Sequence, residues 1–308
     1  IALVGPQEQD FDTLARCADI AMYRAKRRGN SYAFYVPGEA GEVTSRFALE
    51  GELRKALADG TIEVYYQPRI NLETGRYDSV EALARWHHPE QGAISPGIFV
   101  AIAEESGQVG ALGRHVMEVA CRDLVAWRKR GIAVRMAVNL SVFELQDPDI
   151  VLRIARTLQH HRVDGSWLEI EVTESAAMSD PEANVATLEQ LKALGIDLAI
   201  DDFGTGYSSL SYLKRLPADF LKIDRSFVDG VTQDDGRSID ADIVRAIIAL
   251  AQSLELQVIA EGIEEAGQEQ FLRRHGCQLA QGFYYCKPQP EAAMLAILEA
   301  QLEAGSAG

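Results

Sequence analysis

Two adjacent carboxylates follow an apolar run in the second half of the chain. Asp201 and Asp202 come directly after residues 196–200, and they open the glycine-rich segment DDFGTGYSSL. Other apolar segments also end on polar side chains, namely Asn139, Glu171, Glu174, Lys222, Asp224 and Glu261. Carboxylate and amide oxygens are the ligands that hard divalent cations such as Mg²⁺ and Mn²⁺ prefer. The sequence therefore predicts a metal site built from several strand ends.

A cluster of carboxylates at one rim is electrostatically costly. Glu81, Glu171, Asp201, Asp202 and Glu261 would lie close together, with Lys222 as the only obvious nearby cation. Their mutual repulsion in a partly desolvated site favours the entry of cations. A pair of Mg²⁺ or Mn²⁺ ions in such a site can activate a water and stabilise the attacking and leaving oxygens of a phosphate.

Eight predicted strands must bring these side chains together. They cover residues 62–67, 79–86, 134–139, 167–172, 197–202, 219–224, 256–261 and 277–284, and helical patterns fill most of the gaps between the later ones. This alternation predicts an α/β fold, a TIM-like (β/α)8 barrel whose strands end on one face. Only residues 68–78 join the first two strands, too few for a helical crossover, so the first strand is expected to run antiparallel to its neighbour.

Length and composition limit the class of protein. The chain has 308 residues, 47% of them hydrophobic, so one large barrel with a small extra piece is expected. A formal net charge of -16 argues against binding to duplex nucleic acid, because Lys and Arg supply most of such affinity. No apolar stretch approaches the length of about 20 residues that spans a bilayer. The four cysteines form no CxxC pair, which favours reduced thiols and a cytoplasmic location.

The first 40 residues have a different character from the rest. A short amphipathic helix is expected over residues 12–28 and a strand over 32–36. The stretch ADIAMYRAKRRGNSYAFY, residues 18–35, resembles the carboxyl-terminal end of GGDEF (diguanylate cyclase) domains, while the GG(D/E)EF signature is absent from this chain. We therefore expect residues 1–40 to be a GGDEF remnant and linker without cyclase activity, followed by the barrel over residues 41–308.

A series of motifs in the barrel resembles one family. SVEALARWHHP contains Glu81-Ala82-Leu83, and VNLS, EIEVTES, DDFGTGYSSL, LKID, IAEGIE and QGFYY follow in order. Together they resemble the EAL domain, a cyclic-di-GMP phosphodiesterase, over about residues 45–303. The resemblance implies a barrel with an antiparallel first strand, and metal-dependent hydrolysis of cyclic di-GMP to linear pGpG.

The resemblance also implies a role for each site residue. Glu81, Asn139, Glu171 and Asp201 are expected metal ligands, and Asp202 is expected to bind a second ion. Lys222 and Glu261 would position or deprotonate the attacking water, and which of them is the base stays open. Glu174 would stabilise the DDFGTGYSS loop. Residues expected to contact substrate are Gln67, Leu83, Arg85, Asp224 and Gln281, with Arg85 on the same face of its strand as Glu81.

Two alternatives are kept. Asp201 and Asp202 could instead form an Asx turn and helix N-cap, and the domain could bind cyclic di-GMP as a non-catalytic receptor or scaffold. The intact acidic set favours the enzyme. A homodimer is expected from the resemblance, and so is an upstream regulatory or sensor domain missing from this chain.

Overall fold

The fold is seen in a computed structural model, which describes residues 34, 40–206, 210–231 and 238–306 of the chain. The predicted helix over residues 12–28, the strand over 32–36 and part of the DDFGTGYSSL segment lie outside the described residues. The GGDEF remnant and the boundary at residue 40 therefore stay predictions.

Among the described residues, eight strands close into a barrel and two short strands flank it. Neighbouring strands follow the order β10-β1-β9-β8-β7-β6-β5-β4-β2-β3, and pairing of β1 with β2 closes the ring. Their bounds are β1 Glu63–Asn71, β2 Tyr77–His88, β3 Gly92–Ile94, β4 Arg135–Asn139, β5 Leu168–Thr173, β6 Asp197–Phe203, β7 Phe220–Ile223, β8 Gln257–Ala260, β9 Leu279–Ala280 and β10 Gln289–Pro290. The predicted TIM-like barrel is confirmed.

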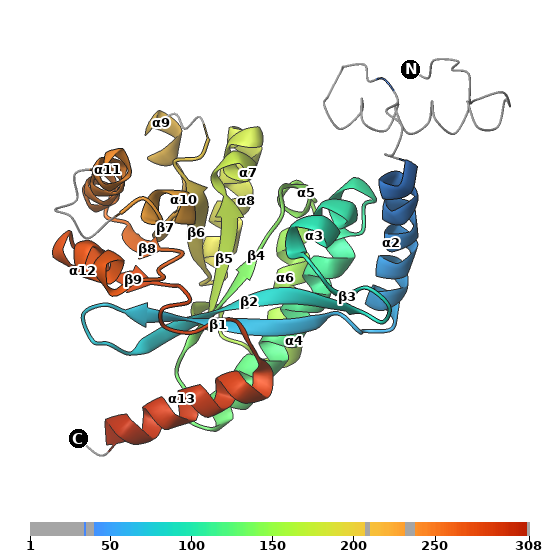
Figure 1. The fold of residues 1–308 in the computed structure, drawn as a ribbon, viewed down its shortest axis with the longest axis horizontal. Coiled ribbons are helices and arrows are strands. Elements are labelled where there is room, and N and C mark those ends of the chain that lie inside the picture. Colours follow the sequence, from blue (N-terminus) through green and yellow to red (C-terminus); the bar gives the residue numbers. More distant parts are fainter. Residues whose placement is uncertain (1–33, 35–39, 207–209, 232–237, 307–308) are drawn as a thin grey trace, which may run out of the picture.

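The first strand runs against its neighbours in the barrel, as predicted. β1 is antiparallel to both β2 and β9, whereas the pairs from β2–β4 through β8–β9 are parallel. Figure 1 shows β1 and β2 as a long hairpin, with α13 lying along it. Since β1 runs in the opposite direction, its carboxyl end lies away from the site, and its middle residues must supply any groups directed there.

Helices cover the outside of the barrel, as Figure 1 shows. Their bounds are α2 Ala40–Ala58, α3 Pro96–Glu105, α4 Val109–Lys129, α5 Val142–Leu145, α6 Ile150–His161, α7 Glu174–Ser179, α8 Pro181–Ala193, α9 Leu210–Leu213, α10 Arg225–Val228, α11 Ile239–Ser253, α12 Ala266–Arg274 and α13 Glu291–Ser306, with a 3-10 turn at Gly165–Trp167. The barrel strands bury apolar side chains such as Met136, Ile170 and Leu221 against them. Within the described residues, no helix is long and apolar enough to cross a membrane.

One predicted strand is much shorter in the structure. The prediction of 277–284 is wrong at its carboxyl end, because β9 stops at Ala280. Gly282 explains the change of course: a Cβ atom at this position would lie 2.0 Å from the Ile263 carbonyl oxygen. The backbone after β9 thus passes directly against the segment after β8, and Gln281 is placed at the rim between them.

Candidate active site

The predicted site residues come from neighbouring strands and meet at one end of the barrel. Asn139 pairs with Glu171 in the ladder between β4 and β5, and Asp201 pairs with Thr173 between β5 and β6. A cavity of about 260 Å³ opens at this end. Its lining residues are Gln67, Glu81, Leu83, Asp201, Lys222, Arg225, Glu261, Gly262, Glu264, Gln281, Gly282 and Phe283.

The Lys222 ammonium lies at the centre of the acidic cluster. Its Nζ is 2.5 Å from Glu171 Oε2, 2.9 Å from Asp201 Oδ2 and 2.7 Å from Glu261 Oε1. Burial alone would lower the pKa of Lys222, but Asp201, Glu171 and Glu261 outweigh it and raise the pKa well above its ordinary value. Burial in turn raises the pKa of Glu261, against the opposing effect of Lys222. Lys222 is therefore held as a cation, and Glu261 is the group better placed to take up a proton.

A second set of contacts connects Glu81 with three amide side chains. Asn139 Nδ2 donates to Glu81 Oε1 at 2.8 Å, and Gln281 Nε2 donates to Glu81 Oε2 at 2.7 Å. Gln281 Nε2 also donates to Gln67 Oε1 at 3.0 Å. Both oxygens of the buried Glu81 carboxylate thus accept hydrogen bonds, one from β4 and one from the segment after β9, and Gln67 of β1 is joined to Glu81 through Gln281.

Arg69 is a site residue that the sequence analysis missed. Its side chain is fully buried at 0% exposure, and its guanidinium contacts Glu169, Glu171 and Gln281. The expectation that Lys222 is the only nearby cation is therefore wrong. One signal was available: Glu169 and Glu171 alternate with apolar residues in LEIEVTE, and a carboxylate buried in a central parallel strand requires a cationic partner.

The two adjacent aspartates differ in backbone conformation. Asp201 Oδ1 accepts the Asp202 backbone N–H at 2.8 Å, and Asp202 adopts a φ of 54° in the left-handed region. The strand pairing between β6 and β7 is irregular at this point. Burial, followed by the charges of Asp201 and Asp224, raises the pKa of Asp202 to about 6. Asp201 thus faces Lys222, while Asp202 is turned out of the regular strand.

Three other predicted residues make local contacts. Glu174 Oε2 accepts the Gly204 backbone N–H at 2.8 Å, which connects α7 to the loop after β6. Asp224 caps α10 by accepting the Ser226 backbone N–H at 3.0 Å. Arg85 lies on the same face of β2 as Glu81 but outside the cavity lining, and its Nη1 donates to the Ala84 carbonyl oxygen at 2.8 Å. The loop-stabilising and substrate-binding roles stay predictions.

The predicted metal ligands all offer oxygen atoms, which are the donors that a hard divalent cation prefers. Oxygen atoms of Glu81, Asn139, Glu171, Asp201 and Asp202 come from the adjacent strands β2, β4, β5 and β6. In the part of the chain that the structure describes, no three acidic, histidine or cysteine side chains are already gathered around an ion-sized position. Lys222 instead contacts two of the predicted ligands, so those side chains must exchange this contact for a cation.

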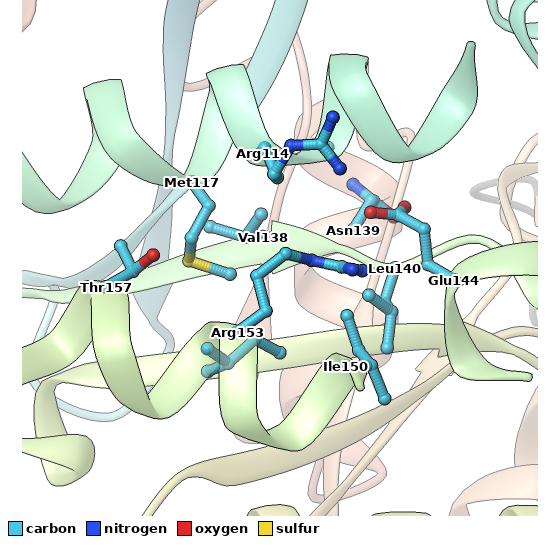
Figure 2. A pocket seen from close by; sticks show the side chains of 11 residues that line it. Arg114, Met117, Val138, Asn139, Leu140, Glu144, Ile150, Arg153 and Thr157 are labelled. Carbon is cyan, nitrogen blue, oxygen red and sulfur yellow. The ribbon is translucent and has the colours of Figure 1, made fainter. Parts of the chain in front are cut away.

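A second, smaller cavity lies between Asn139 and the helices that cover β4. It measures about 20 Å³ and is bounded by α4, α5 and α6. Figure 2 shows Arg114 and Arg153 reaching from two helices toward the side of Glu144, with Asn139 beside them. Glu144 is 5% exposed, and burial raises its pKa despite hydrogen bonds from Ser141. A cavity of this size has room for about one water.

Comparison with known proteins identifies the family. The chain belongs to the EAL domain family, whose sequence model matches residues 50–288. It is 43% identical over 298 residues to the bifunctional diguanylate cyclase/cyclic di-GMP phosphodiesterase MucR of Pseudomonas aeruginosa, covering 96% of this chain and 43% of that protein. It is 40% identical over 294 residues to the cyclic di-GMP phosphodiesterase PdeR of Escherichia coli, covering 95% and 44%. The chain thus spans less than half the length of these curated relatives.

A solved structure gives the same result for the fold. The structure described as PaMucR phosphodiesterase in complex with c-di-GMP superposes with a TM-score of 0.77 and 44% sequence identity. The match covers 80% of this chain and 99% of that one.

Proposed function

We propose that this chain is a phosphodiesterase that uses Mg²⁺ or Mn²⁺, as a pair of ions in one site, to hydrolyse cyclic di-GMP to linear pGpG. The observation that carries the proposal is the cavity in which Lys222 contacts Glu171, Asp201 and Glu261 beside Glu81. Relatives whose names specify cyclic di-GMP phosphodiesterase activity support the choice of substrate.

Different residues are proposed to bind the cations, to accept the water proton and to position the other groups. Glu81, Asn139, Glu171, Asp201 and Asp202 would hold the cations, which supply, when bound, a Lewis acid for water and phosphate oxygens. A water oxygen forms a bond to phosphorus while the bond from phosphorus to one ribose 3′-oxygen breaks. Glu261 accepts the water proton, the leaving oxygen takes up a proton from solvent to become the 3′-hydroxyl, and Glu261 then releases its proton to solvent. Lys222 stays an ammonium that fixes Glu261.

Substrate contacts would come from the rim of the cavity. Gln67, Leu83 and Gln281 line it together with the catalytic groups. Arg85 is half-buried and could reach a phosphate after releasing the Ala84 carbonyl, since a guanidinium binds phosphate through paired N–H donors. Asp224 would act from the end of β7, where it also caps α10.

The test is hydrolysis of cyclic di-GMP by the purified chain in Mg²⁺ or Mn²⁺, with pGpG separated from substrate by chromatography. We expect pGpG with either cation, and none in EDTA. The second candidate is a non-catalytic receptor, which the same cavity would suit. Tight binding of cyclic di-GMP without turnover under any metal condition would establish the receptor and end the enzyme proposal.

Homodimer formation and an upstream sensor domain belong to the same proposal. The fact that this chain spans less than half of its curated relatives supports a larger regulated protein. Sedimentation of the purified chain with and without cyclic di-GMP would test the dimer directly.

A further inference from the structure

The Arg69 side chain occupies the barrel interior below the acidic cluster. It lies two residues after Gln67 on β1, so alternation along the strand places both side chains on the same, inward face. A fully buried arginine is rare unless it is paired, because removing its charge from water is costly. Its position therefore requires partners inside the barrel.

The guanidinium contacts groups from three other parts of the barrel. Nη1 donates to Glu169 Oε1 at 2.6 Å, and Nη2 donates to Glu171 Oε1. Nε donates to Gln281 Oε1 at 2.7 Å, and Nη2 also lies 3.6 Å from Glu81 Oε2. Burial alone would lower the pKa of Arg69, but the carboxylates of Glu171 and Glu169 raise it.

Arg69 and Lys222 each contact a different carboxylate oxygen of Glu171. Arg69 contacts Oε1, and Lys222 contacts Oε2 at 2.5 Å. A carboxylate with a cation on each oxygen has its plane and rotamer fixed. Glu171, a predicted metal ligand, is thereby oriented before any cation binds.

Arg69 also determines which way the Gln281 amide points. A guanidinium can only donate hydrogen bonds, so Gln281 must turn its oxygen toward Arg69. Its nitrogen is then left to donate to Glu81 Oε2 and to Gln67 Oε1. Gln67, having used its oxygen as acceptor, donates through Nε2 to the Cys286 carbonyl oxygen at 3.1 Å. One buried guanidinium therefore sets the direction of every hydrogen bond in this chain of amides.

We propose that Arg69 is a positioning residue of the active site, which orients Glu171 and the Gln281 amide so that Glu81 and Glu171 present their oxygens to a divalent cation. The inference rests on the proposed function for its kinetic consequence, but its structural core concerns cation binding alone. Lysine cannot replace it fully, because an ammonium on a flexible stem cannot address Glu169, Glu171 and Gln281 with one planar fork.

The test compares Arg69→Gln and Arg69→Lys with Arg135→Gln as control. Arg135, at the start of β4, pairs with Asp197 at 2.9 Å near the opposite end of the barrel, so its loss weakens an ion pair outside the cavity. Circular dichroism and thermal unfolding first establish that each variant is folded. Mn²⁺ binding is then measured by electron paramagnetic resonance, and hydrolysis of cyclic di-GMP by steady-state kinetics.

We expect Arg69→Gln to weaken Mn²⁺ binding and to lower kcat by about 10- to 100-fold, as loss of groups that orient metal ligands does, with KM changed little. Arg69→Lys should recover part of the Mn²⁺ affinity, and Arg135→Gln should keep both values. A folded Arg69→Gln with the parent's Mn²⁺ affinity would overturn the proposal, as would an equal loss in Arg135→Gln.

The two proposals fail in different ways. A parent chain that binds Mn²⁺ but makes no pGpG contradicts the proposed function, while the Mn²⁺ affinities still decide the role of Arg69. A parent chain that binds no Mn²⁺ overturns both. Should Arg69→Gln not fold, Glu169→Gln removes only the charge of one Arg69 partner, and unchanged Mn²⁺ affinity in that variant would count against the inference.

Discussion

The Asp201 carboxylate accepts the backbone N–H of Asp202 at 2.8 Å, and this contact accompanies a left-handed backbone at Asp202, with φ of 54°. Asparagine and aspartate adopt this conformation more readily than other residues with a Cβ, whereas a β-branched side chain is strained there. The two adjacent carboxylates are thereby directed differently, although they follow one another in the chain.

Replacing Asp202 separates its backbone and side-chain roles. Asp202→Asn should keep the stability of the parent but lower hydrolysis at least about 100-fold, because it removes a predicted metal ligand. Asp202→Val should lose a further ~1–3 kcal/mol of unfolding free energy through backbone strain. Urea unfolding and pGpG formation measure the two effects. Equal stability of the Asn and Val variants would contradict the strain argument.

Removing Lys222 should make stability depend on divalent cation. Lys222→Met leaves Glu171, Asp201 and Glu261 without their shared ammonium, so we expect a loss of about 3 kcal/mol in EDTA. Part of this loss should return in Mg²⁺, which can occupy the acidic site. Urea unfolding in the two buffers provides the measurement.

Lys192→Met is the matched control for Lys222. It removes an ion pair with Asp219 at 2.8 Å that is about one-third exposed, and so should cost less than about 1 kcal/mol in either buffer. The explanation fails if Lys222→Met is as stable as the parent in EDTA, or if Mg²⁺ stabilises Lys192→Met equally.

Glu174 should matter through its acceptor oxygen. Glu174→Gln keeps an oxygen for the Gly204 backbone N–H, whereas Glu174→Ala leaves that donor without this partner. We expect the alanine variant to lose about 10-fold in kcat while the glutamine variant loses much less. The comparison uses steady-state hydrolysis at saturating Mg²⁺. Identical losses in both variants would show that charge, and not the hydrogen bond to Gly204, is what counts.

The buried Glu144 predicts a pH dependence of stability. Burial raises its pKa, with Ser141, Arg153 and Arg114 acting in the opposite direction. The folded state therefore binds this proton more tightly than the unfolded state, so the contribution is present at low pH and is lost as pH rises through the raised pKa. The parent should accordingly lose stability relative to Glu144→Gln as pH rises from 4 to 8. Urea unfolding of both proteins at the two pH values measures this change. A constant difference between the two proteins would contradict the raised pKa.

The effect of Gly113→Ala on stability should change sign when Glu144 is also replaced. A Cβ atom at position 113 would lie 2.1 Å from Glu144 Oε1, so Gly113→Ala alone should destabilise by ~1–3 kcal/mol. Combined with Glu144→Ala the clash disappears, and the same substitution should stabilise α4 by up to about 1 kcal/mol through helix propensity. Thermal unfolding of the four proteins in this cycle gives the result, and a Gly113→Ala effect that keeps its sign would refute the contact.

The sequence predicts the site better where it lies at the end of a strand than where it lies inside the barrel. Asn139, Glu171, Asp201 and Lys222 each follow or close an apolar run, and the parallel strands bring such ends together. Arg69 gives no such signal, because in YYQPRINLETG it resembles a solvated charge before a turn. Its partner Glu169 lies 100 residues away, and only the closed barrel places them in contact.

Local sequence also fails to determine where the last barrel strand, β9, ends and the segment that carries Gln281 begins. Residues 277–284 read as one strand, yet only Leu279–Ala280 pair. The reason is a contact distant in sequence, the close passage of Gly282 against Ile263. Arg225 and Glu264 were missed for the same reason: their 2.8 Å ion pair at the cavity rim joins the segments after β7 and β8.

The hydrogen bonds beneath the cavity join the beginning of the barrel to its end, and this sets an order of events during synthesis. Gln67 contacts a carbonyl 219 residues later in the sequence, and Arg69 contacts Gln281 212 residues later. Contacts this distant form late, because the loop they close must first be made and ordered. A nascent chain that has not yet reached residue 281 carries Arg69 without its amide acceptor and a barrel that cannot close. The catalytic cluster is therefore assembled only when translation of this domain is almost complete.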